Sequence, residues 1–153
     1  MRRCLAILFC VLFLCQCSAQ EAVLHDSEQQ TIPLSSLQGK WLILNYWADW
    51  CDACRREVPQ LNAFYRKHKG EVQLLGVNFD QLASKRLRLA VRRLNFEFPV
   101  ILENPAQFWP VKTPQILPTT VIVGPDGRIR VTLTGEQTEE SLDQSWQKVR
   151  QAG

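Results

Sequence analysis

Two cysteines separated by two residues, Cys51 and Cys54, have the spacing in this chain that most directly suggests chemistry. A Cys-x-x-Cys pair can cycle between dithiol and disulfide, form a structural bridge, or supply two ligands to a metal. A structural bridge this short removes little entropy from the unfolded chain. A zinc site needs four ligands, and His25 and His68 do not form a second spaced pair. A redox pair is therefore favoured over a structural bridge and over metal binding, including copper delivery.

The position of the pair supports this prediction. Residues 41–47 (WLILNYW) form a nearly continuous apolar run, which is typical of a strand buried on both faces, and residues 51–68 have helical periodicity. Unpaired backbone N–H groups and the helix dipole stabilise a thiolate at Cys51, and one helical turn brings Cys54 onto the same face. Cys51 is the expected attacking thiol and Cys54 the resolving one. No cofactor or metal is expected beyond this redox-active disulfide.

The remaining elements alternate in a way that predicts an α/β fold. A second buried strand and a second helix follow, then two strands joined by a Gly-Pro-Asp-Gly turn, and a closing helix (72–79, 81–94, 119–123, 128–134 and 137–151). The order β-α-β-α-β-β-α predicts a central mixed β-sheet flanked by α-helices. With 153 residues, 46% of them hydrophobic, the chain suits one domain, and a net charge of +3 does not indicate nucleic-acid binding.

Residues 1–19 have the features of a secretory signal peptide: a basic head, an apolar run at residues 5–14 and small residues at its end. This run is about half as long as a membrane-spanning helix. Lipidation at Cys17, an uncleaved anchor and a buried core helix are the alternatives. Membrane contact is expected only with lipidation or an anchor.

Cleavage would remove four of the six cysteines and leave Cys51 and Cys54. Two cysteines are too few for a disulfide scaffold. We expect a periplasmic or other extracytoplasmic protein. Residues 20–30 are a polar leader expected to be loose, and residues 31–153 form the domain.

Two stretches resemble a known family. "GKWLILNYWADWCDACRREVP", residues 39–59, resembles the thioredoxin superfamily and, within it, the exported TlpA-like thiol-disulfide oxidoreductases. "LPTTVIVGPDGRI", which begins at Leu117, is similar to the second signature of that family. The resemblance implies a thioredoxin-like fold and a cis peptide bond between Leu117 and Pro118 that faces the cysteines. It also implies that the backbone of Leu117 binds an extended partner peptide. Ile116 stands where many members have glycine.

Three further residues bear on the chemistry. Trp50 is expected to cover the sulfurs and present a flat surface to partners, with core packing as the alternative. Asn45 stands where cytosolic thioredoxins carry a buried aspartate, and an amide cannot carry a proton for Cys54. Glu57, one helical turn past Cys54, is the candidate for that task, because the matching glutamate of TlpA-like proteins is implicated in tuning the thiols. A solvated carboxylate is the alternative. Asp52 disfavours a thiolate beside it, whereas Arg55 and Arg56 act in the opposite direction.

This charge balance predicts a reductant, because strong oxidants owe their potential to a stabilised thiolate. The resemblance implies that its partners are disulfide-containing or dithiol proteins, such as apocytochrome c before haem attachment. It also implies a membrane electron donor of the DsbD type. An oxidant or isomerase, and a copper carrier, are the alternatives. Residues 85–96 predict a basic amphipathic helix with either a solvated face or a face that docks to anionic lipid or an acidic partner.

Overall fold

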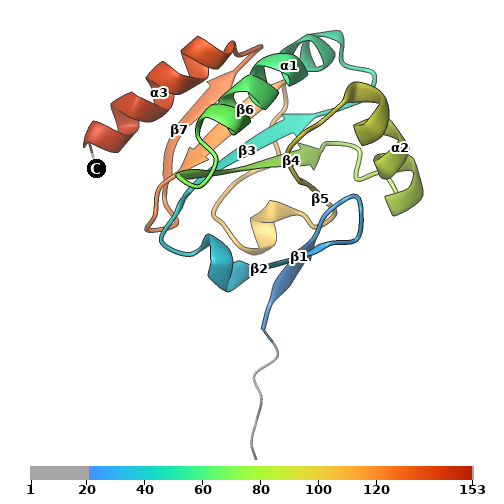
Figure 1. Cartoon of the computed structure of the whole chain (residues 1–153), viewed down its shortest axis with the longest axis horizontal. Coiled ribbons are helices and arrows are strands. Elements are labelled where there is room, and N and C mark those ends of the chain that lie inside the picture. Colours follow the sequence, from blue (N-terminus) through green and yellow to red (C-terminus); the bar gives the residue numbers. More distant parts are fainter. Residues whose placement is uncertain (1–20, 153) are drawn as a thin grey trace, which may run out of the picture.

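The structure is a computed structural model that describes residues 21–152 (Figure 1). The predicted signal peptide and the lipidation site at Cys17 lie outside these residues. The elements, in chain order, are β1 (Val23–His25), β2 (Thr31–Pro33), the 3-10 helix η1 (Leu34–Leu37), β3 (Trp41–Trp47), α1 (Asp52–Lys67), β4 (Val72–Asn78), α2 (Ser84–Leu94), β5 (Val100–Ile101), the 3-10 helix η2 (Pro105–Gln107), β6 (Thr119–Val123), β7 (Ile129–Thr134) and α3 (Glu139–Ala152).

A five-stranded mixed sheet in the order β5-β4-β3-β6-β7 forms the centre of the domain. β4 runs parallel to both β3 and β5, whereas β6 is antiparallel to β3 and to β7. β3 is the middle strand, which explains why its sequence is apolar on both faces. The predicted mixed sheet with flanking helices is confirmed, and β5, only two residues long, is an addition to it.

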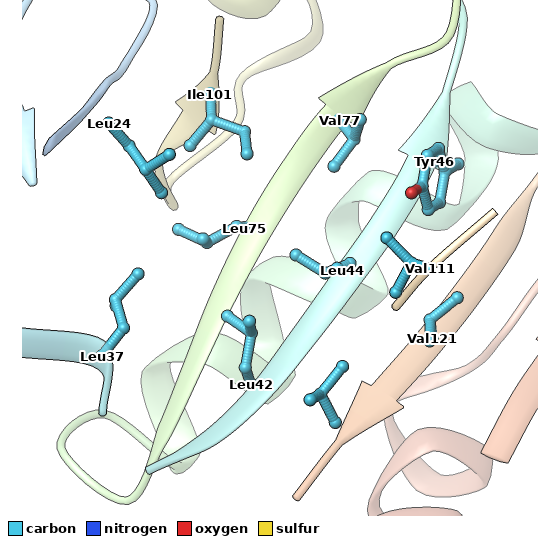
Figure 2. Packing of buried hydrophobic residues seen from close by; sticks show 11 residues of the cluster. Leu24, Leu37, Leu42, Leu44, Tyr46, Leu75, Val77, Ile101, Val111 and Val121 are labelled. Carbon is cyan, nitrogen blue, oxygen red and sulfur yellow. The ribbon is translucent and has the colours of Figure 1, made fainter. Parts of the chain in front are cut away.

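Side chains of the strands alternate between two layers of core. Figure 2 shows Leu42, Leu44 and Tyr46 of β3 in one cluster with Leu75 and Val77 of β4. The β1–β2 hairpin and the segment before β6 cover this face. Helices α1, α2 and α3 lie over the opposite face (Figure 1).

The segment of residues 21–30 is ordered into the fold, so the expectation that the polar leader is loose is wrong. β1 pairs antiparallel with β2, and Asp26 forms an isolated bridge with Ile101. Leu24 has no exposed surface and belongs to the cluster in Figure 2. Burial of Leu24 and the hairpin hydrogen bonds hold this mostly polar segment in place.

The proline-containing segment before β6 serves the core. Phe108 and Trp109 are partly buried against the same cluster as Leu24. These two side chains of the segment at residues 105–115 therefore help to cover the core. Among the described residues, no helix has the length and apolar character needed to cross a membrane.

Candidate active site

The two cysteines lie where the chain passes from the end of β3 into α1. Cys51 is the N-cap of α1, with extended backbone, and its sulfur accepts a hydrogen bond from the backbone N–H of Cys54 at 3.1 Å. The two residues form a disulfide with their Cα atoms 5.3 Å apart. Cys51 is 7% exposed and Cys54 is 2% exposed. Cys51, at the end of the helix, is therefore slightly more exposed than Cys54.

Glu57 is fully buried, which rules out the solvated carboxylate considered from the sequence. Its Oε1 accepts a hydrogen bond from the backbone N–H of Gln137 at 3.2 Å, and its Oε2 accepts one from Asn45 Nδ2 at 3.4 Å. Desolvation raises the pKa of Glu57 to about 8, against the opposing effect of these two hydrogen bonds and with a small contribution from the nearby charge of Glu136. A carboxyl group in this environment gains and loses its proton close to neutral pH.

The register of α1 relates the position of this carboxyl group to that of Cys54. Glu57 follows Cys54 by three residues, so both side chains lie on the same buried side of the helix. A thiol has an ordinary pKa of about 8.5, close to that of the buried carboxyl. Because proton transfer is efficient between groups of similar pKa, the pKa of Glu57 is suited to exchanging a proton with a thiol.

Asn45 holds the carboxyl in place rather than carrying a proton. Its Nδ2 also donates a hydrogen bond to Thr120 Oγ1 at 3.1 Å, so one amide bridges Glu57 and β6. Thr120 and Gln137 were not identified from the sequence. They lie 75 residues from Asn45 and 80 residues from Glu57, respectively, and no local pattern signals such contacts.

The bond between Leu117 and Pro118 is cis, as the resemblance implied. β6 begins at the next residue, Thr119, which pairs with Tyr46 near the end of β3. This register places Pro118 at the edge of the sheet from which α1 starts. Leu117 packs against the cluster that contains both cysteines.

The loop before the cis bond is held by a local hydrogen bond. Thr119 Oγ1 donates to the carbonyl of Ile116 at 2.7 Å, while the side chain of Ile116 is 61% exposed. The departure from glycine at this position therefore presents an apolar side chain to solvent two residues before the cis proline.

Trp50 and Asp52 both lie on the outer rim of the site. Trp50 is 61% exposed, so the core-packing alternative is wrong, and its indole Nε1 donates to Asp80 Oδ2 at 2.8 Å. The carboxylate of Asp52 is largely exposed and forms an ion pair with Arg55. Solvent and the guanidinium both screen the charge of Asp52, so its influence on Cys51 is weaker than the sequence alone suggested.

No group of three or more His, Cys, Asp or Glu side chains comes together as a possible metal site within residues 21–152.

The sequence is similar to known redox proteins. The sequence model of the AhpC/TSA family matches residues 16–132. The thiol-disulfide oxidoreductase ResA of Bacillus cereus is 31% identical over 134 residues, which cover 86% of this chain and 76% of that protein. The ResA protein of Bacillus subtilis is 30% identical over 125 residues, covering 81% and 69% of the two chains.

Solved structures agree with the sequence comparison. The crystal structure of StoA from Bacillus subtilis superposes with a TM-score of 0.66 at 25% identity, covering 80% of this chain and 93% of that one. A DsbF homologue from Corynebacterium diphtheriae has a TM-score of 0.69 at 20% identity, covering 84% and 83%, which shows the shared fold. The resemblance to TlpA-like proteins of the thioredoxin superfamily is therefore confirmed.

Proposed function

The chain belongs to the AhpC/TSA family and is a thiol-disulfide oxidoreductase, and from this premise we propose that it reduces disulfides in proteins outside the cytoplasm. The observation that carries the proposal is the buried carboxyl of Glu57, one turn along α1 from Cys54. The basic head, apolar run and small residues of the N-terminal sequence support export.

In the proposed reaction, the thiolate of Cys51 attacks one sulfur of a partner disulfide. The partner disulfide breaks, a mixed disulfide with Cys51 forms, and the other partner sulfur leaves and takes up a proton. Cys54 then gives its proton to the carboxylate of Glu57, and its thiolate attacks the sulfur of Cys51. The second partner sulfur leaves and is protonated. The partner gains two electrons as a dithiol, and Cys51 and Cys54 are left as the disulfide.

Glu57 supports the reducing direction through its effect on the thiolate. Two acidic groups buried one turn apart resist carrying two negative charges, so ionisation of one raises the pKa of the other. Both Cys54 and Glu57 are almost without solvent exposure, which strengthens this coupling. A dithiol that does not gain a stabilised thiolate gives up its electrons readily. Asp52, which the sequence pointed to, contributes less because it is paired and exposed.

Partners and electron supply follow from the same direction. Substrates would be proteins with unwanted disulfides, including apocytochrome c before haem attachment. Trp50 and the backbone of Leu117 would contact the partner peptide, and Pro118 would keep that backbone free of the strand. A protein that reduces disulfides in an oxidising compartment must be recharged, which we assign to a membrane reductase of the DsbD type.

The reduction potential of the pair tests the proposal. Equilibration with thiol buffers is expected to give a value nearer the about −270 mV of thioredoxin than the about −120 mV of a strong oxidant. A value near the latter would make the protein an oxidant, and a disulfide that exchanges with no buffer thiol would make the bridge structural. Glu57→Gln is expected to become less reducing in alkaline buffer. Glu140→Gln, which changes an exposed carboxyl on α3, should match the unmodified protein. A protease-accessibility assay on intact cells tests the location separately.

A further inference from the structure

Positive charge is concentrated on α2. Five of the 18 Lys and Arg residues of the chain lie on this helix, which has no Asp or Glu, so the rest of the chain has 13 basic and 15 acidic residues. We use "basic face" for five exposed residues of α2: Lys85, Arg86, Leu89, Arg92 and Arg93. Leu89 is 61% exposed, and the four cations stand three or four residues from it on either side. The basic face therefore consists of one exposed apolar side chain with two cations before it and two after it on the same side of the helix.

Ion pairs within the fold neutralise only part of the charge of the basic face. Arg92 pairs with Glu28 at 2.8 Å, and Arg93 pairs with Asp49 at 3.4 Å. Within residues 21–152, Lys85 and Arg86 form no ion pair. The face consequently keeps a net positive charge available to a binding partner.

The basic face adjoins the reactive disulfide. The opposite side of α2 packs in the same cluster as Cys51 and Cys54. The partner of Arg93, Asp49, lies two residues before Cys51, and Asp80, which holds the indole of Trp50, lies just before α2. A helix of eleven residues is about 16 Å long and about 10 Å across, so the face lies within reach of a segment that continues from a peptide bound at the sulfurs.

The immediate rim of the disulfide has the opposite character. Asp49 and Asp52 lie on either side of Cys51 in the sequence and pair with arginines, and Asp80 accepts a hydrogen bond from the indole next to Cys51. Acidic residues directly next to a partner's reactive cysteine would meet these carboxylates. Acidic residues several positions away would instead reach the basic face, where opposite charge accelerates encounter and fixes orientation.

From this arrangement we propose that the basic face of α2 is a docking surface for an acidic segment of the protein that exchanges disulfides with Cys51, set a few residues from that protein's reactive cysteine. The inference rests on the proposed thiol-disulfide exchange and adds the class of partner to it. Leu89 supplies an apolar anchor at the centre of the contact. A membrane surface fits less well, because the apolar stripe that would enter a bilayer (Leu87, Ala90 and Val91) is buried in the core.

The test uses peptides with one central cysteine, carried as a mixed disulfide with neutral 2-mercaptoethanol. One peptide has four neutral residues on each side of the cysteine and three glutamates at each end. A second replaces these glutamates by lysines, and a third places them beside the cysteine. The reduced, full-length protein is mixed with each, and the rate of reduction is followed by stopped-flow fluorescence. Neutral hydroxyethyl disulfide gives the basal rate.

At low ionic strength the peptide with distant glutamates is expected to react at least about tenfold faster than the lysine peptide, and faster than the third peptide. The ratio should fall to within about twofold at high salt, where the charges are screened. In the double variant Lys85→Glu, Arg86→Glu the advantage should disappear while hydroxyethyl disulfide reacts as before. The matched double variant Lys69→Glu, Lys148→Glu, which reverses two exposed cations elsewhere, should keep it.

Equal loss in both double variants would overturn the proposal, because net charge rather than the basic face would then be responsible. Binding to vesicles containing phosphatidylglycerol that depends on Lys85 and Arg86, together with unchanged peptide rates, would also overturn it in favour of lipid. If the protein does not react with hydroxyethyl disulfide, the proposed exchange function fails. Anisotropy with labelled peptides whose cysteine is replaced by serine then still decides: tighter binding of the acidic peptide supports the docking surface, and equal binding refutes it.

Discussion

The protein is expected to lose stability as pH rises because Glu57 ionises, and Glu57→Gln is expected to remove this loss. The carboxyl group has a pKa of 4.5 in the unfolded chain and about 8 when buried in the native state. The native state therefore holds this proton more tightly. Its contribution to stability is fully present below the lower value and is lost as pH rises through the higher one.

The magnitude follows from these two pKa values. Between about pH 5 and about pH 9, linkage predicts that the ionisation of Glu57 alone lowers the free energy of unfolding by about 4 kcal/mol. The amide introduced by Glu57→Gln would resemble the protonated acid, since both are neutral and each keeps a carbonyl oxygen that can accept one of the two hydrogen bonds, from Gln137 or from Asn45. The variant should match the unmodified protein at the acidic end of this range and exceed it at the alkaline end.

Urea unfolding of the oxidised protein at several pH values measures this difference directly. Glu140→Gln removes an exposed carboxyl from α3 and should leave the pH dependence of the unmodified protein unchanged. If the free energies of Glu57→Gln and the unmodified protein decline in parallel across this range, Glu57 titrates normally. Both the proton-transfer role and the argument for a reductant would then lose their basis.

Four further outcomes are expected. Cys54→Ser should accumulate a mixed disulfide with partner proteins, whereas Cys51→Ser should trap none, as non-reducing gels would show. Asp52→Asn should shift the reduction potential by less than about 30 mV, since an exposed ion pair contributes little. Trp50→Ala should change the free energy of unfolding by less than about 0.5 kcal/mol yet slow exchange with a peptide disulfide, because this indole is exposed beside the reactive sulfur. Leu24→Ala should lower the free energy of unfolding, measured with urea, by about 2–4 kcal/mol. Leu89→Ala, which changes an exposed leucine, is the control. If Leu24→Ala lowers this free energy by less than Leu89→Ala does, β1 is not part of the core.

The elements that position the cysteines could be predicted because their signals are local. The apolar run 41–47 is β3 with the same ends, and the strand predicted at 119–123 is β6. The helix expected from Cys51 begins there, with Cys51 as its N-cap. The helix expected from Gln81 starts three residues later at Ser84, because Asn78 Oδ1 accepts from the N–H of Leu82 and keeps the chain in a turn.

What the sequence did not predict depends on contacts between distant residues. β1 and β5 are two or three residues long, and periodicity cannot identify a strand that short. The pKa of Glu57 depends on burial beneath Gln137 and beside Asn45, which the chain brings together only when α3 and the sheet have packed. The position of Glu57 on α1 could be inferred from its spacing, but its environment could not.

The two carboxylates near the pair illustrate why burial outweighs proximity in this site. Asp52 adjoins Cys51 in the sequence, but water and Arg55 surround its charge. Glu57 is more distant in sequence, but its side chain is fully buried, so solvent does not screen its charge. The interaction between two charges strengthens as the effective dielectric constant falls, so we expect the buried group to have the larger influence on the thiols. The same burial makes the ionised glutamate unfavourable for folding, and a buried apolar residue would avoid that cost. A carboxyl group buried at this cost one turn from Cys54 therefore supports the proposed exchange of a proton with that cysteine.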